Sequence, residues 1–236
     1  MSEDVPSLSV RRAAGPAKAV VLVLHGGAEW GQSAVHPWRL AYLRMVPLAR
    51  DIHQAGHEHG VAVWLLRNRV RGWNAPDLDP VRDARWALDR IRAEHPGLPV
   101  VLVGHSMGGR TALRVADDPA VVGVCALAPW TPGPEPVTGV RGKDVLIVHG
   151  TRDRMTDPAD SYSFATRAAA GSARLARFEI EAEGHAMLRR SAVWTRLAST
   201  FTLETLGLPT SDRSVTAAWT KPDDQRLRIP VQQTEK

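Results

Sequence analysis

The stretch that decides the fold is LPVVLVGHSMGGR, residues 98–110. Its apolar and β-branched part, Val100 to Val103, predicts a short buried strand. The strand ends at the pentapeptide GHSMG, residues 104–108, and a helical pattern begins at once at Gly109. A G-x-S-x-G pentapeptide between a strand and a helix is typical of a sharp turn that presents a serine hydroxyl.

The chemistry of such a turn explains its spacing. Ser106 has to adopt a positive φ, which a residue other than glycine adopts only when its surroundings hold it there. Side chains at Gly104 and Gly108 would collide across so tight a turn, which favours glycine at both positions. The free N–H groups at the start of the next helix would face the Ser106 oxygen. A serine that merely caps a helix is the alternative, and the preceding strand disfavours it.

The composition narrows the class of protein. A chain of 236 residues fits one α/β domain with a sizeable core. The net charge of +5 comes from interleaved basic and acidic residues, which predicts no nucleic-acid partner. The single cysteine, Cys125, excludes an internal disulfide and lies in an apolar run. The N-terminus MSEDVPSLSV does not resemble a signal peptide, and no stretch is long enough to span a membrane. We therefore expect a cytoplasmic protein without a membrane partner, and its oligomeric state stays open.

Apolar runs alternate with helical patterns along the whole chain. Strands are expected at residues 8–12, 19–24, 61–66, 100–103, 121–127, 144–148 and 175–180. Helices are expected at residues 37–59, with a break or kink at Pro47, and at 79–96, 109–117, 158–170 and 187–206. This alternation predicts an α/β fold with a mostly parallel sheet and helices on both faces. Residues 1–207 are predicted to form a single domain, and residues 208–236 a C-terminal tail that is mobile or packs as an arm.

Ligands of parallel α/β sheets bind at the carboxyl ends of the strands, so the residues that leave each strand are informative. The first strong strand is followed by HGGA, residues 25–28. Small side chains here let the backbone N–H of Gly27 or Ala28 approach a substrate oxygen, and the N–H of Met107 would complete an oxyanion hole. A glycine-rich turn without a ligand is the alternative.

The strand at residues 144–148 is followed by HGTRD, residues 149–153. A serine hydroxyl becomes a good nucleophile only when a base takes its proton, and that base needs an acid to orient it. Asp153 lies a few residues past the strand end, where a carboxylate can reach inward. Asp157 and Asp160 are alternatives, although Asp157 precedes a proline and fits a helix cap better.

The strand at residues 175–180 is followed by EGHA, which contains His185. No other histidine lies C-terminal to all the candidate acids, so the chain order serine, acid, histidine selects His185 as the base. A histidine on a loop is often only solvated, and its position at a strand end favours the functional interpretation.

The motifs HGG, GHSMGG, HGTRDR and GH, in this order, resemble the α/β-hydrolase superfamily, and in particular its small esterase-like and dienelactone-hydrolase-like members. The resemblance covers roughly residues 19–206. It implies a three-layer α/β-hydrolase fold, a catalytic triad of Ser106, Asp153 and His185, and an oxyanion hole at Gly27 and Met107.

Two departures from the superfamily matter. Only residues 131–143 lie where many relatives insert a lid, which predicts a fold without a cap domain and an open site. Dienelactone hydrolases use a cysteine where this chain has Ser106, so their substrate does not transfer. The resemblance implies hydrolysis of a carboxylic ester or thioester of a small molecule through an acyl-enzyme, without a metal or organic cofactor.

Several interpretations stay open at this point. Trp30, Trp73, Trp130 and Met155 follow strand ends and are the candidates for an apolar substrate site, although tryptophans at loop bases often belong to the core. A small peptidase or amidase, a haloperoxidase or lyase on the same triad, and a non-catalytic hydrolase-fold binding protein are alternative functions. The group His53, His57 and His59 suggests a metal, but no acidic ligand accompanies it, and we expect a solvated helix end.

Overall fold

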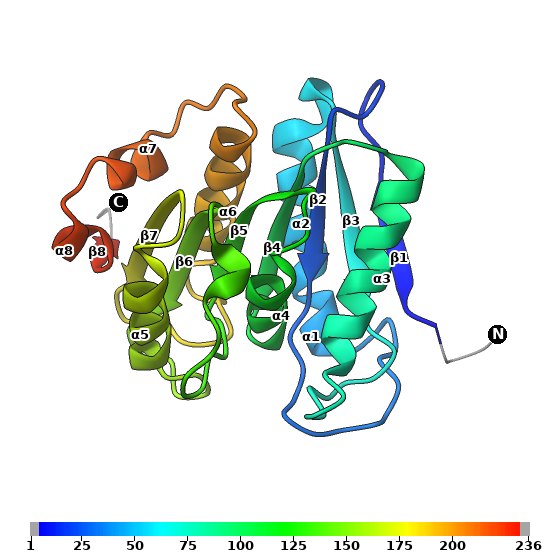
Figure 1. Cartoon of the computed structure of the whole chain (residues 1–236), viewed down its shortest axis with the longest axis horizontal. Coiled ribbons are helices and arrows are strands. Elements are labelled where there is room, and N and C mark those ends of the chain that lie inside the picture. Colours follow the sequence, from blue (N-terminus) through cyan, green and yellow to red (C-terminus); the bar gives the residue numbers. More distant parts are fainter. Residues whose placement is uncertain (1–4, 232–236) are drawn as a thin grey trace.

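The computed structural model describes residues 5–231, and a sheet of eight strands in the order β1-β3-β2-β4-β5-β6-β7-β8 lies at its centre (Figure 1). The strands are β1 (Ser7–Arg11), β2 (Ala19–Leu24), β3 (Val61–Arg67), β4 (Val100–His105), β5 (Val121–Leu127), β6 (Asp144–Gly150), β7 (Arg174–Ile180) and β8 (Ile229–Val231). Strand β1 runs antiparallel to β3, and the other neighbours are parallel. The carboxyl ends of β2 to β7 therefore meet at one edge, where the candidate residues lie.

Helices pack on both faces of this sheet and make three layers (Figure 1). Helices α3 (Asp79–Glu94), α4 (Met107–Val115) and α5 (Pro158–Ala168) cover one face, and α2 (Met45–Gly56) and α6 (Ser191–Thr205) cover the other. Along β2, Val20 and Leu22 face the first group and Val21 and Val23 the second, because side chains alternate along a strand. The short elements are α1 (Leu40–Leu43), α7 (Ser214–Trp219), α8 (Asp223–Arg226) and the 3-10 turns η1 (His57–His59) and η2 (Thr138–Val140). The predicted fold class is confirmed.

Two helices differ from the sequence expectation. The segment at residues 37–59 divides at Arg44 rather than at Pro47, because Pro47 lies in the first turn of α2, where a missing N–H removes no helical hydrogen bond. The last long helix begins at Ser191 and not at Met187. Met187 has a positive φ of 57°, so residues 187–190 form a loop.

The connection between β5 and β6 contains only the turn η2 (Thr138–Val140), so the fold has no cap domain between these strands. Among residues 5–231, no helix is long and apolar enough to cross a membrane. The carboxyl edge of the sheet is consequently bordered by loops and by the short helix α1.

The described part of the predicted tail, residues 208–231, packs against the domain. Val215 in α7 and Ile229 in β8 are buried in the same apolar cluster as the inner face of α6, and β8 extends the sheet by pairing with β7. The carbonyl oxygen of Leu227 accepts a hydrogen bond of 3.2 Å from the buried Arg177 side chain of β7. The sheet thus continues past residue 207.

Candidate active site

Ser106 lies in the turn between β4 and α4 with φ 58° and ψ −121°. A Cβ on Gly104 would lie 2.2 Å from the carbonyl oxygen of Gly108, so the turn itself requires glycine at 104. A Cβ on Gly108 would lie 2.3 Å from the carbonyl oxygen of Leu24. Glycine at 108 is therefore required by the close approach of β2, and not by a collision across the turn as the sequence suggested.

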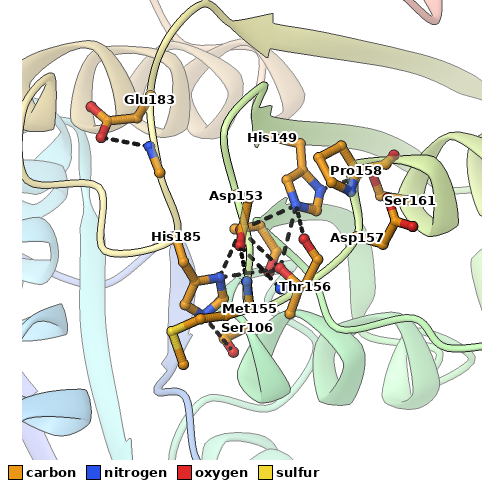
Figure 2. A network of polar contacts seen from close by, with 12 residues as sticks. Ser106, His149, Asp153, Met155, Thr156, Asp157, Pro158, Ser161, Glu183 and His185 are labelled. Atoms are coloured by element: carbon orange, nitrogen blue, oxygen red, sulfur yellow. Dashed lines mark hydrogen bonds and ion pairs between the residues drawn. The ribbon is translucent and has the colours of Figure 1, made fainter.

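The His185 imidazole joins Ser106 to Asp153 (Figure 2). Its Nδ1 lies 2.7 Å from Asp153 Oδ2, and its Nε2 lies 3.0 Å from Ser106 Oγ. An ionised carboxylate only accepts hydrogen bonds, so Nδ1 carries the hydrogen and Nε2 of the neutral ring accepts from the serine hydroxyl. Three side chains from the ends of β4, β6 and β7 thus form one continuous hydrogen-bonded chain.

The Asp153 carboxylate is buried and has donors on both oxygens. Oδ1 accepts from the backbone N–H groups of Met155 (2.8 Å) and Thr156 (3.0 Å), and Oδ2 accepts from Thr156 Oγ1 (2.9 Å). Burial acts to raise the pKa of Asp153, but hydrogen bonds from His149, His185 and the Thr156 and Met155 backbone outweigh it and hold this pKa well below its ordinary value. Asp153 is therefore ionised when it contacts His185.

His149 is part of this network, and the sequence interpretation did not assign it a role. Its Nε2 lies 3.2 Å from Asp153 Oδ2 and 3.3 Å from the Thr156 carbonyl oxygen, and its Nδ1 lies 2.8 Å from Ser161 Oγ (Figure 2). Both acceptors near Nε2 are oxygens without a hydrogen, so this nitrogen carries the proton. The signal available in the sequence was the position of His149 at the start of HGTRD, at the end of β6.

The loop that carries His185 is held by two further buried residues. The Glu183 carboxylate accepts from the backbone N–H groups of Gly184 (3.0 Å) and Arg190 (2.7 Å). His105 lies beneath the loop, and its Nε2 donates to the carbonyl oxygen of His185 at 2.9 Å. Burial, aided by the charge of the nearby His185, lowers the pKa of His105 to about 3, so His105 is neutral and braces the loop.

The backbone after β2 lies beside Ser106. A Cβ on Gly26 would lie 3.3 Å from Ser106 Cβ, and a Cβ on Gly27 would lie 2.4 Å from Met107 Cε. The N–H of Ala28 already donates to the Arg71 carbonyl oxygen at 2.9 Å, whereas the N–H of Gly27 takes part in no backbone hydrogen bond within residues 5–231. Met107 begins α4, so its N–H has no helical acceptor. Gly27, and not Ala28, offers the free donor next to Met107.

His25 fixes the conformation of this glycine segment. Its Nε2 accepts the backbone N–H of Asn68 at 3.1 Å, so its Nδ1 carries the hydrogen and donates to the Gly26 carbonyl oxygen at 2.6 Å. Burial lowers the pKa of His25 to about 4, although the hydrogen bond to Gly26 opposes the shift. A neutral His25 thus holds the backbone that presents Gly27.

The four candidate substrate-binding residues lie in different environments. Trp130 and Met155 line a cavity of about 540 Å³ beside Asp153. Trp30 is exposed on a loop and lines none of the cavities beside the site. Trp73 is buried, and its ring centroid lies 4.1 Å from Cζ of Arg110. The ring centroid of Trp130 lies 4.6 Å from the same carbon. Trp73 thus packs in the interior, as tryptophans at loop bases often do, and does not line the cavity beside Asp153.

The structure also shows the surroundings of the alternative acid Asp157 and of the histidine group that suggested a metal. Asp157 caps α5 by accepting the N–H of Ala159 at 2.8 Å, as its position before a proline predicts. His53 and His57 stack on each other with ring centroids 5.0 Å apart, and His53 Nε2 contacts the Arg12 carbonyl oxygen. In the part of the chain that the structure describes, no group of three or more His, Cys, Asp or Glu side chains is arranged to hold a metal ion.

A mostly parallel sheet between two helical layers, with a serine on a strained turn after β4, defines the α/β-hydrolase fold, here without a cap domain between β5 and β6. A family model described as "Hydrolase_4: Serine aminopeptidase, S33" matches residues 15–143, and the chain belongs to this family.

Relatives and solved structures agree on this class. The chain is 32% identical to human monoglyceride lipase over 103 residues, which span 43% of this chain and only 31% of the lipase. A serine hydrolase without a lid from Xanthomonas campestris superposes with a TM-score of 0.64 at 17% identity, covering 88% of this chain and 91% of that one. A monoacylglycerol lipase from Paleococcus ferrophilus gives a TM-score of 0.61 at 15% identity, covering 84% and 99%. The TM-scores of these two structures show a shared fold, and at identities this low they show nothing beyond the fold.

Proposed function

We propose that the protein hydrolyses a carboxylic ester or thioester of a small molecule through an acyl-enzyme on Ser106. The observation that carries the proposal is the hydrogen-bonded chain from Ser106 Oγ through His185 to the ionised Asp153, with distances of 3.0 and 2.7 Å. A binding protein has no need of a base held in this tautomer beside a strained serine. The name of the related monoglyceride lipase also supports an ester substrate.

In the proposed reaction, His185 Nε2 takes the proton of Ser106 as Oγ forms a bond to the carbonyl carbon. The resulting oxyanion accepts hydrogen bonds from the N–H groups of Gly27 and Met107. His185 then gives its proton to the leaving alcohol or thiol as that bond breaks. Water repeats both steps on the acyl-enzyme and releases the acid. Asp153 stays ionised throughout and stabilises the protonated imidazole. Each proton and bond is accounted for by these groups, so we propose a reaction without a cofactor.

A second candidate is hydrolysis of an amide or of the N-terminal bond of a peptide. The family description names a serine aminopeptidase. The cavity beside Asp153 is lined by Asp157 and Asp160, whose carboxylates would attract a substrate ammonium group. The same triad chemistry applies, with an amine as the leaving group.

The experiment that tests the proposal is labelling of the purified protein with a fluorophosphonate probe, which reacts with activated serines. We expect labelling of the wild type and of the control Ser211→Ala, and none of Ser106→Ala or His185→Ala. Labelling that persists in Ser106→Ala would exclude Ser106 as the nucleophile. Chromogenic esters compared with aminoacyl anilides then separate the two candidates, because an esterase cleaves the esters much faster and an aminopeptidase requires the free amino group.

A further inference from the structure

Two neighbouring strands of the sheet end in strained backbone. Ser106 follows β4 with a φ of 58°, and Ala128 follows β5 with a φ of 42°. A residue other than glycine costs free energy in this region of φ and stays there only when its surroundings hold it. The turn that carries Ser106 therefore needs contacts that fix its backbone, in addition to those that orient its hydroxyl.

The carbonyl oxygen of Ser106 accepts two backbone hydrogen bonds. One comes from the N–H of Arg110 in α4 at 3.1 Å, and the other from the N–H of Trp130 in the loop after β5 at 3.2 Å. This loop lies tightly against α4, because a Cβ on Gly109 would lie 3.0 Å from Pro129 Cβ. The backbone of Ser106 is thus held by two different elements of the fold.

The side chains of the same two residues are stacked on each other. Cζ of the buried Arg110 lies 4.6 Å from the ring centroid of Trp130 and 4.1 Å from that of Trp73. The two rings are nearly perpendicular, with an angle of 85° between their planes. A guanidinium over the faces of two indole rings is attracted to both. Side chains as well as backbone groups therefore join α4 to the loop after β5.

Glu135 completes this connection with a buried carboxylate. Its Oε2 accepts from Arg110 Nε at 2.8 Å and lies 2.7 Å from Arg110 Nη2, and its Oε1 accepts from Arg114 Nε. The backbone carbonyl oxygen of Glu135 accepts from Arg167 Nη1 of α5 at 2.8 Å. Because the Glu135 side chain is only 1% exposed, removal of its charge would leave Arg110 buried without an ionised partner.

We propose that Glu135 is a positioning residue for the nucleophile Ser106. The Glu135 carboxylate fixes the Arg110 guanidinium between the two tryptophan rings, and this arrangement holds the loop after β5 against α4. Ser106 then keeps the backbone conformation in which its Oγ lies 3.0 Å from His185 Nε2. The inference rests on the proposed function of Ser106. Glu135 acts through Arg110 and Trp130 and not on the reacting atoms.

The test compares Glu135→Gln with the wild type in kcat and KM for p-nitrophenyl butyrate. Glutamine keeps the size of the side chain but not its charge, so the two arginines lose their ionised acceptor. We expect kcat to fall about ten- to a hundred-fold with KM within about three-fold, because a small displacement of a reacting group costs rate more than binding. The rate constant of fluorophosphonate labelling should fall by a similar factor. Glu135→Asp, which keeps the charge, should recover part of both losses.

The matched control is Asp118→Asn. Asp118 is also a buried carboxylate, and it lies 2.5 Å from Arg92 Nη2. It belongs to the turn between α4 and β5, which is at the opposite edge of the sheet from Ser106. We expect both variants to lower the free energy of unfolding in urea, but only Glu135→Gln to lower kcat. Equal losses of kcat in the two variants would show a general loss of stability and overturn the positioning role.

Arg110→Lys takes the place of Glu135→Gln if the glutamine protein does not fold. Lysine keeps a charge for Glu135 but lacks the planar guanidinium that stacks on both rings, so we expect the same loss of kcat. Wild-type kcat in either folded variant, or a loss confined to KM, overturns the positioning role and leaves the proposed function intact. A wild-type protein that neither cleaves the ester nor reacts with the fluorophosphonate overturns the proposed function instead.

Discussion

The imidazole of His149 lies 3.2 Å from Oδ2 of Asp153, the same oxygen that His185 contacts at 2.7 Å. Asp153 therefore lies between two histidines, as Figure 2 shows. Behind His149, Ser161 Oγ accepts a hydrogen bond of 3.1 Å from the buried Arg177 Nε, and its hydroxyl lies 2.8 Å from His149 Nδ1 and 3.0 Å from the Pro158 carbonyl oxygen. The Nε2 hydrogen of His149 points toward the carboxylate, so we expect His149 to act as a positioning residue for Asp153.

The first prediction concerns His149. The variant His149→Phe keeps a planar ring but loses the donor to Asp153, and a hydrogen bond to a charged group contributes about 1.5–3 kcal/mol. We expect kcat for a short-chain ester to fall about ten- to a hundred-fold with KM within about two-fold, because Ser106 and the glycine segment after β2 are unchanged. Measurement of kcat and KM separately checks this expectation.

The control for that prediction is His149→Gln, whose amide restores a donor near Asp153. We expect it to recover part of the lost kcat. If His149→Phe and His149→Gln lose kcat to the same extent, or if KM rises in step with the loss, His149 only fills space and the positioning role is wrong.

A second prediction concerns the glycine segment after β2. In Gly27→Ala, the new methyl group would meet the Arg71 carbonyl oxygen at 2.3 Å and Met107 Cε at 2.4 Å, so the backbone has to move. Displacement of one oxyanion donor costs about 100- to 1,000-fold in kcat, and we expect a loss of this size in ester hydrolysis. Gly15→Ala is the matched control, because a Cβ there meets nothing within 4 Å. A Gly27→Ala protein with wild-type kcat would remove Gly27 from the proposed oxyanion hole.

The structure shows which of these features the sequence can predict. The turn at Ser106, the apolar strands and the order of Asp153 and His185 follow from local patterns and from the rule that parallel strands bring their carboxyl ends to one edge. The distance between Ser106 and His185 is then set by the sheet, which is why residues 79 positions apart lie 3.0 Å from each other.

Other features depend on how loops lie against each other, and no local pattern encodes that. His149 contacts Asp153, but the sequence shows it only as the end of a buried strand. Glu183 accepts a hydrogen bond from the backbone N–H of Arg190, but the sequence shows it only as a carboxylate on a loop. Trp73 follows a strand, as a residue lining a pocket would, yet its ring covers Arg110. An aromatic residue at a loop base fits both environments, so only the packing separates them.

A third prediction concerns stability in acid. The pKa of His25 is lowered to about 4 and that of His105 to about 3, mainly by burial, whereas both titrate near 6.5 when unfolded. The unfolded chain therefore binds more protons between pH 6.5 and 4. The contribution of the two neutral histidines to the free energy of unfolding is complete above pH 6.5 and is lost as the pH falls. The slope of the free energy of unfolding against pH approaches two protons, about 2.7 kcal/mol per pH unit.

Urea denaturation of the wild type and of His25→Asn at several pH values between 7 and 4 measures this slope. The asparagine keeps an acceptor near the Asn68 N–H but does not titrate, so we expect the slope to fall by about one proton. Equal slopes in the two proteins would show that His25 is not neutral in the folded state. Asp153, whose pKa is lowered, adds a loss that begins near pH 5 and grows as the pH falls, but this loss is common to both proteins and cancels in the comparison of their slopes.

The last prediction concerns residues after Gly207, which the sequence leaves as a tail outside the domain. Val215 and Ile229 are buried against α6 and β7, and burial of one such side chain contributes roughly 1.5–3 kcal/mol. We expect a chain that ends at Gly207 to lose at least about 3 kcal/mol in its free energy of unfolding, measured by urea denaturation, and to bind a hydrophobic dye at the exposed face of α6. Full-length Val215→Ala is the companion variant, with an expected loss of about 1–2 kcal/mol from the cavity that it leaves. A truncated chain as stable as the full one would mean that residues 1–207 are a complete domain, as the sequence predicts, and that the contacts of Leu227 and Ile229 contribute nothing to its folding.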